Sequence, residues 1–178
     1  MFTLEMSSPF RSGWNGGIGG PNDGGHKPPL WYIQYGMDLG VAAGTELYAA
    51  FDGTITRFNP DTPSGNPKVY GNQLFVRYDN DRMGGFYTHF NDSGPDIRPG
   101  QPIVRGQRLG KIMRDHLHLA LVEIIGGAPG GRYVGIDLYR HFLGLADLRD
   151  TSIAVTFNED GTPPDVAYRV PESLLISL

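Results

Sequence analysis

One ten-residue run, His116 to Ile125, constrains the fold more than any other part of the chain. Its apolar residues fall on both faces of an extended strand, which is typical of a central strand that is covered on both sides. Gly126 and Gly127 follow it and end the strand. The 26 Gly and 14 Pro of the whole chain favour tight turns and leave little room for long helices. We therefore expect a mainly β protein built around this strand.

Two histidines open the strand, His116 and His118, with Leu117 between them. Because side chains alternate along a strand, both imidazoles point to the same face. Two neutral imidazoles on one face can hold a divalent metal, or one can hold it while the other transfers protons. The alternative is a half-buried strand with two polar residues turned outward, and the pair alone does not decide between them.

Composition and charge exclude several classes of function. A chain of 178 residues suits one domain with a sizeable core. The net charge of -4, without a basic block, gives no electrostatic case for a nucleic-acid partner. The absence of cysteine leaves His, Asp and Glu as metal ligands. We expect no membrane span and no signal peptide in this chain, because no stretch has the required apolar length or flanks.

The chain divides into three segments. Residues 1–29 form a Gly- and Pro-rich arm, which we expect to be irregular because glycine adds no packing and proline removes a ladder donor. Residues 30–145 form the main domain. His26 lies in the arm, and we interpret it as an exposed loop histidine rather than a site residue. Residues 146–178 are a C-terminal extension, whose two strand-like runs around a turn-rich segment predict a terminal hairpin.

Within the main domain, short runs rich in β-branched and aromatic residues predict strands that are separated by turn formers. Asp52-Gly53 indicates a hairpin or tight corner, and a second hairpin brings His89 near a strand end. A short helix is expected between Gly135 and Leu145. The predicted strands are Leu30–Leu39, Glu46–Ala50, Thr54–Phe58, Gln73–Tyr78 and Gly85–Phe90.

From about Tyr32 to Leu143 the chain resembles the lysostaphin-type (LytM-like) zinc metalloendopeptidases. The resemblance rests on the order of eight short motifs, which together are far more specific than any one of them. They are Gln34-Tyr35-Gly36-Met37-Asp38-Leu39, Gly44 to Ile55, Tyr70-Gly71-Asn72, Tyr87-Thr88-His89-Phe90, Pro99-Gly100-Gln101, Gly106-Gln107-Arg108-Leu109-Gly110, His116-Leu117-His118-Leu119 and Asp137 to Leu143.

The resemblance implies an antiparallel β-sheet domain whose groove holds one zinc ion and cleaves peptide cross-bridges of bacterial peptidoglycan. In that family the metal is held by the histidine and aspartate of an H-x-x-x-D motif and by the second histidine of H-x-H. The matching positions here are Gln34, Asp38 and His118. The positions of His116 and His89 assist with the attacking water and the developing oxyanion.

Gln34 departs from the family pattern, since a neutral amide oxygen is a weak zinc donor. Losing even a supporting residue weakens metal binding or activity about 10–100-fold, so loss of an imidazole ligand should weaken zinc affinity at least that much. Three alternatives remain: Gln34 binds through its oxygen, His26 replaces it from the arm, or the site takes a harder metal that prefers oxygen ligands.

Two functions from different classes follow. The first is a peptidoglycan-directed metalloendopeptidase with an altered zinc site, favoured by the presence of Asp38, His89, His116 and His118. The second, favoured by Gln34, is a non-catalytic relative that serves as a wall-binding or structural subunit of a phage tail or injection-type assembly. A wall substrate together with the missing signal peptide predicts a protein that acts at the cell wall. It would reach the wall inside a phage particle, on a phage tail or related injection machine, or with the help of a membrane-permeabilising partner.

Overall fold

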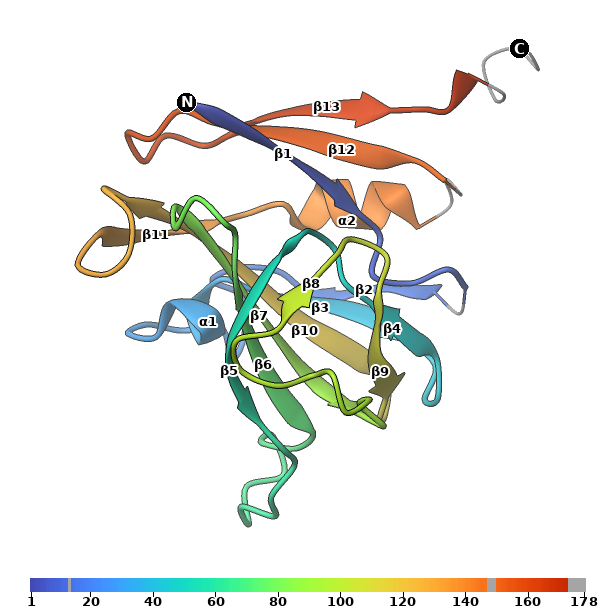
Figure 1. Ribbon diagram of the computed structural model, residues 1–178. Coiled ribbons are helices and arrows are strands. Elements are labelled where there is room, and N and C mark those ends of the chain that lie inside the picture. The colour runs from blue at the N-terminus through green and yellow to red at the C-terminus, as the bar shows by residue number, and fades with distance from the viewer. Residues whose placement is uncertain (13, 147–149, 173–178) are drawn as a thin grey trace.

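The computed structural model describes residues 1–12, 14–146 and 150–172, which form two antiparallel sheets and two short helices (Figure 1). The end of the expected C-terminal extension, residues 173–178, lies outside the described residues. Within the described ranges, no helix has the length and apolar character needed to cross a membrane.

The helices are α1 (Trp31–Gln34) and α2 (Tyr139–Leu145). The strands are β1 (Phe2–Ser7), β2 (Trp14–Gly19), β3 (Gly36–Val41), β4 (Glu46–Tyr48), β5 (Gly53–Asn59), β6 (Asn72–Arg77), β7 (Met83–Asn91), β8 (Pro102–Ile103), β9 (Arg108–Ile112), β10 (His116–Ile125), β11 (Arg132–Ile136), β12 (Ser152–Phe157) and β13 (Asp165–Arg169).

The main sheet is organised around β10. Its strands follow the order β2-β3-β10-β7-β6-β5-β8, and β11 pairs with the second half of β10. Every residue of β10 is buried except His116 and Ile125 at its ends, which are partly exposed. A strand flanked on both edges and covered on both faces needs apolar residues at successive positions, because neither face meets water. The predictions of a central covered strand and a mainly β antiparallel fold are confirmed.

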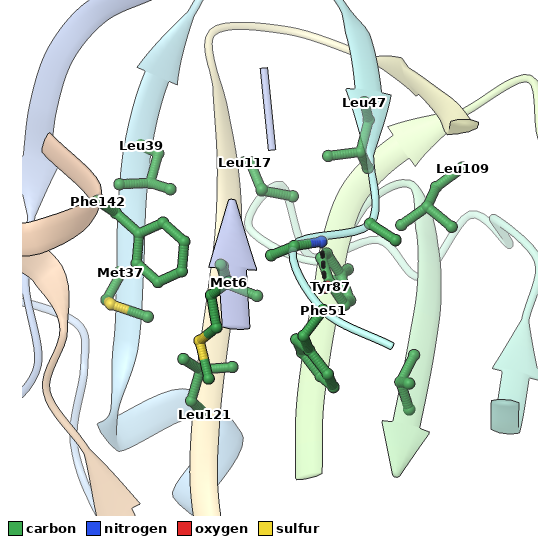
Figure 2. Close-up of a cluster of buried hydrophobic side chains, with 14 of the residues drawn as sticks. Met6, Met37, Leu39, Leu47, Phe51, Tyr87, Leu109, Leu117, Leu121 and Phe142 are labelled. Atoms are coloured by element: carbon green, nitrogen blue, oxygen red, sulfur yellow. Dashed lines mark hydrogen bonds between the residues drawn. The ribbon is translucent and has the colours of Figure 1, made fainter. Parts of the chain in front are cut away.

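A second, three-stranded sheet joins the two ends of the chain. Its order is β1-β12-β13, with Phe2 opposite Phe157 and Ser7 opposite Ser152. In Figure 1 this sheet lies above α2, which separates it from the main sheet. Met6 of β1 and Phe142 of α2 belong to one hydrophobic core together with the strands of the main sheet (Figure 2). The small sheet thus closes the core over α2.

The strand expected over Leu30–Leu39 is wrong in its first half, where the chain forms the single helical turn α1. Gln34 N–H donates to the carbonyl of Leu30 at 2.8 Å, and Tyr35 N–H donates to that of Trp31 at 2.9 Å. The aromatic residues that suggested a strand instead pack against the sheet, with the Tyr32 ring 5.1 Å from the ring of Phe86. Tertiary packing therefore overrides the β-propensity of this segment.

One further expectation needs correction, and one alternative is decided. The Gly- and Pro-rich arm is not irregular throughout, because β2 pairs with β3 and extends the main sheet. Gly17 of β2 has no side chain that would overlap the ring of Tyr139, so α2 can pack directly against this strand. At Asp52-Gly53, where a hairpin or tight corner was expected, the structure has the corner, because β4 pairs with β9 while β5 pairs with β6 and β8. The segment is a corner between two strands.

We predict that Tyr87→Phe destabilises the fold. The backbone N–H of Ala50 donates to the Tyr87 hydroxyl at 3.1 Å, and both residues are fully buried (Figure 2). Removing the hydroxyl leaves this N–H without a partner, so the free energy of unfolding should fall by about 1–3 kcal/mol. Urea unfolding measures the change, with Tyr78→Phe at a partly exposed tyrosine as the control. Equal stability of Tyr87→Phe and wild type would contradict the prediction.

Candidate metal centre

The register between β3 and β10 brings Asp38 and the histidine pair together. Asp38 lies directly opposite His118 on the neighbouring strand, and His116 lies opposite Gly40. Residues opposite each other in an antiparallel pair have their side chains on the same face. The Nδ1 atom of His118 is 2.9 Å from Oδ1 of Asp38. Two residues that are eighty positions apart in the sequence thus share one site.

Gly36 sets the position of the His118 ring. It lies two residues before Asp38 on β3, so it faces the same side of the sheet. A Cβ atom at this position would overlap the Cε1 atom of His118, and its distance to Nε2 would be 2.6 Å. Glycine is needed here for close approach of the ring to the backbone. His118 is 5% exposed as a result of this packing.

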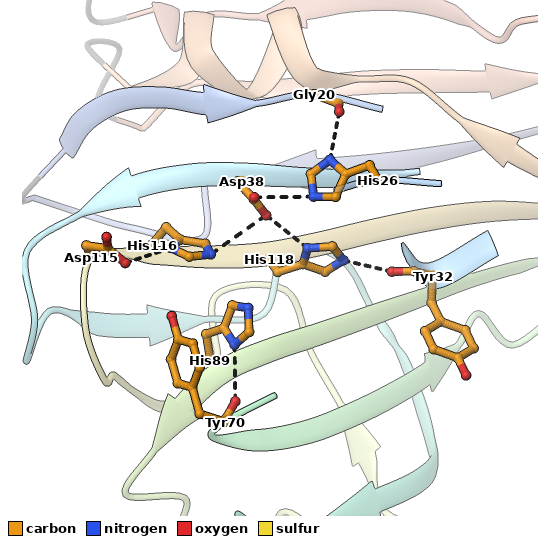
Figure 3. A network of polar contacts seen from close by, with 9 residues as sticks. All are labelled: Gly20, His26, Tyr32, Asp38, Tyr70, His89, Asp115, His116 and His118. Carbon is orange, nitrogen blue, oxygen red and sulfur yellow. Dashed lines mark hydrogen bonds and ion pairs between the residues drawn. The ribbon is translucent and has the colours of Figure 1, made fainter. Parts of the chain in front are cut away.

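His26 reaches the same carboxylate from the segment after β2. Its Nε2 atom is 3.2 Å from Oδ2 of Asp38, and its Nδ1 atom is 2.7 Å from the carbonyl oxygen of Gly20 (Figure 3). The side chain is 8% exposed, so the interpretation of His26 as an exposed loop histidine is wrong. One ligand atom each from His26, Asp38 and His118 lies within 4.8 Å of the others, a spacing that could hold a metal ion.

The outer nitrogen of each imidazole is already committed to a backbone carbonyl. Nδ1 of His26 donates to Gly20, and Nε2 of His118 donates to Tyr32 at 2.7 Å (Figure 3). In the neutral ring the remaining nitrogen carries a lone pair, and both of these nitrogens face Asp38. Lone pairs opposite a carboxylate repel it, so this arrangement requires protons on the imidazoles or a cation between the three groups. Such outer-nitrogen bonds are the usual support of metal-ligating histidines.

The negative charge of the site is carried by the carboxyl group of Asp38. Burial opposes ionisation of Asp38, but the hydrogen bonds from His118 and His26 outweigh it and hold the pKa of this carboxyl well below its usual range. The hydrogen bond to Asp38 in turn raises the pKa of His26 against the opposing effect of burial. Asp38 is therefore ionised at neutral pH and attracts a positive charge to the space between the imidazoles.

The side chain of Gln34, at the third ligand position that the resemblance implies, is hydrogen-bonded to another residue. Its Nε2 atom donates to Oδ1 of Asn22 at 2.8 Å, and it is absent from the described residues that line the groove around the site. The structure brings His26 beside Asp38 and His118. Of the three sequence alternatives, this geometry fits replacement of the missing histidine by His26.

His89 enters the site through an irregularity in the sheet. Asn72 pairs with Phe90 and Gln73 pairs with Thr88, so His89 is an extra residue on β7, with a left-handed φ of 75°. Such bulges redirect side chains, and here Thr88 and His89 both line the groove. Nδ1 of His89 donates to the Tyr70 carbonyl at 3.1 Å. Burial lowers the pKa of His89 to about 4, so the ring is neutral at pH 7.

His116 lies beside His89 and is oriented by a carboxylate. Its Nδ1 atom is 2.7 Å from Oδ1 of Asp115, and its Nε2 atom is 3.9 Å from Oδ1 of Asp38 (Figure 3). The rings of His89 and His116 are 4.8 Å apart. The hydrogen bond from His116 holds the pKa of Asp115 below its usual value. Asp115 was not a sequence candidate, although its position directly before H-x-H was visible.

The four histidines line a groove of about 840 Å³. Its walls also include Tyr32 and Phe86, and the segment 66–70 forms part of its edge. Arg114 lies on this edge, with its guanidinium carbon 3.9 Å from the centre of the Tyr70 ring. The groove therefore combines a polar centre with aromatic and basic walls, which suits a ligand with both peptide and apolar groups.

We predict that Gly36→Ala displaces the His118 ring, because the added methyl group occupies the space of that ring. The free energy of unfolding should fall by about 1–3 kcal/mol, as for overpacking of a filled interior, and the His118 imidazole signals should shift in an NMR spectrum. Gly94→Ala is the matched control, since a Cβ there meets no atom within 4 Å. Unchanged His118 signals in Gly36→Ala would contradict this packing.

Comparisons with known proteins give the family and the fold. The model of peptidase family M23 matches residues 32–126, more than half of the chain. A zinc containing peptidase from Vibrio cholerae has a similar structure, with a TM-score of 0.50, 18% identity, and coverage of 73% of this chain and 38% of that one. For the antimicrobial peptidase lysostaphin from Staphylococcus simulans the TM-score is 0.50, the identity is 18%, and the shares are 88% and 59%.

The chain thus spans less than two thirds of either protein, and at this identity the likeness shows the fold. No curated protein matched the chain significantly. The resemblance found in the sequence is confirmed by the family match and by the fold, and the chain belongs to peptidase family M23.

Proposed function

We propose that the protein is a zinc-dependent peptidase that cleaves peptide cross-bridges of bacterial peptidoglycan, with one zinc ion held by His26, Asp38 and His118. The observation that carries this proposal is the pair of imidazole nitrogens facing one ionised carboxylate, each ring fixed by a backbone carbonyl behind it. Two imidazoles and a carboxylate are a usual donor set of catalytic zinc sites, which leave a further position open. Membership of family M23 supports the reaction class.

When bound, zinc supplies a Lewis acid that lowers the pKa of a water molecule and polarises a carbonyl group. His89 contributes an acceptor. Its Nδ1–H is used by the Tyr70 carbonyl and its ring is neutral, so Nε2 carries a lone pair. In Figure 3 this second ring nitrogen points toward the other histidines. His89 can therefore accept a hydrogen bond from the attacking water and keep it oriented.

His116 contributes a proton carrier. Its Nδ1–H donates to the carboxylate of Asp115, which fixes the orientation of the ring. Nε2 is then free to deliver a proton to the leaving amine or to hydrogen-bond the developing oxyanion. The two histidines differ in role because one has a backbone carbonyl behind it and the other a carboxylate.

The sequence also allowed a non-catalytic wall-binding or structural subunit, and the reason for it was Gln34. Because His26 can supply a third ligand beside Asp38 and His118, a glutamine at position 34 does not argue against metal binding. We therefore favour the enzyme. Association with a phage tail or an injection-type assembly stays a prediction.

The ligand set predicts a clear ranking of zinc affinities. Wild type should bind about one zinc ion per chain. His26→Ala should weaken zinc binding by more than the about 10–100-fold that loss of a supporting residue costs, whereas Gln34→Ala should weaken it less. Competition with a chromophoric chelator measures both. If Gln34→Ala lost zinc and His26→Ala kept it, Gln34 and not His26 would be the ligand.

Cleavage should depend on zinc and on His89. A chelator should abolish release of peptide fragments from purified peptidoglycan, and added zinc should restore it. His89→Ala should lower kcat about 10²–10⁴-fold while the zinc content remains that of wild type. His141→Ala is the matched control, because that histidine lies on α2 and does not line the groove. A zinc-loaded wild type that cleaves no peptidoglycan would instead support the non-catalytic subunit.

A further inference from the structure

We propose that Gln34 is a positioning residue, which together with Asn22 clamps the His26 loop, residues 20–26, against the metal site. The inference rests on the proposed function, since it takes His26 as a zinc ligand. It gives a physical role to the residue that departs from the family pattern. In this role Gln34 holds the replacement ligand in place and does not itself contact the metal.

Two hydrogen bonds join the same pair of residues. The side-chain Nε2 of Gln34 donates to Oδ1 of Asn22 at 2.8 Å, and the backbone N–H of Asn22 donates to the carbonyl oxygen of Gln34 at 2.8 Å. One bond is between side chains and the other between backbones, so they fix both the position and the direction of the chain at Asn22. Gln34 is the last residue of α1, so the two bonds tie the loop to the end of that helix.

The His26 loop is built so that fixing Asn22 also fixes His26. Asn22 has a left-handed φ of 65°, a conformation that asparagine tolerates better than most residues. Asp23 N–H donates to the Gly20 carbonyl at 3.2 Å, and His26 N–H donates to the Asp23 carbonyl at 2.8 Å. The same Gly20 carbonyl accepts the His26 Nδ1–H at 2.7 Å. Two successive turns and one side-chain bond therefore make the loop a single unit.

The helical turn α1 supports both proposed imidazole ligands. The carbonyl of Tyr32 accepts a hydrogen bond from the outer nitrogen of His118 (Figure 3). Gln34 bonds to Asn22 in the loop that carries His26. A ligand that is only sometimes in place lowers the apparent affinity of the site by the fraction of time that it is correctly placed. Loosening the loop should thus weaken zinc binding even though every ligand remains.

The test is a set of zinc dissociation constants, measured by competition with a chromophoric chelator. Gln34→Ala and Asn22→Ala should each weaken zinc binding about threefold to tenfold, as for loss of a modest hydrogen bond that is partly exposed to water. The double variant should bind zinc no more weakly than the single variant with the lower affinity. Both changes remove the same side-chain hydrogen bond, so their effects should not add. Lys27→Ala, at an exposed neighbour of His26, is the matched control and should leave the affinity unchanged.

A second background separates positioning from ligation. In a His26→Ala protein the clamp has no ligand to position, so adding Gln34→Ala should not change the residual affinity. NMR of the zinc-free protein provides an independent readout, in which the His26 Nδ1–H signal of Gln34→Ala should exchange faster with water than that of wild type. Unfolding midpoints close to wild type would show that the variants remain folded.

The outcomes distinguish the two proposals. If wild type binds zinc, His26→Ala loses it, and neither Gln34→Ala nor Asn22→Ala changes the dissociation constant, the clamp is wrong and the ligand set stands. If Gln34→Ala weakens binding while Asn22→Ala does not, Gln34 acts on the metal directly and the clamp is again wrong. If wild type binds no zinc, or His26→Ala binds it unchanged, the ligand set under the proposed function fails first.

Discussion

The carboxylate of Asp38, shared between two imidazoles, is the interaction on which the site depends. One oxygen faces His118 across the β3–β10 pair and the other faces His26. Backbone carbonyls of Gly20 and Tyr32 hold the far side of each ring. A buried carboxylate is stable only with partners of this kind, and ring nitrogens so oriented can pass from binding protons to binding a metal ion.

The site contains local features that work against stability. His89 has a left-handed backbone conformation at a bulge, which costs a non-glycine residue of order 1–3 kcal/mol. Gly36 leaves the strand without a side chain where the His118 ring needs the space. Neither feature would increase the stability of a sheet that had no functional site. Both are understandable if the sheet has to direct His89 and His118 into one groove.

The contacts of the N-terminal segment show that it is an integral part of both sheets. By composition it is an arm of the main domain, yet β2 extends the main sheet and β1 pairs with β12. The loop that follows β2 delivers His26 to Asp38. The proposed ligand set is therefore assembled from three separate parts of the chain, and the proposed replacement of a ligand histidine draws on a segment outside the matched family region at residues 32–126.

The sequence by itself determined the central strand and the side-chain pattern around it. The apolar run of β10, the alternation that puts His116 and His118 on one face, and the order of the family motifs are local or linear properties, so they could be recognised without coordinates. Asp38 and His89 followed from the same motifs. Only the tertiary structure decided that His26 lies beside Asp38 and that the Gln34 side chain bonds to Asn22, because the path of a glycine-rich loop depends on contacts such as those of Gly20 and Asn22. The bulge at His89 and the helical turn α1 likewise arise from neighbouring strands and packed rings, which a single stretch of sequence does not encode.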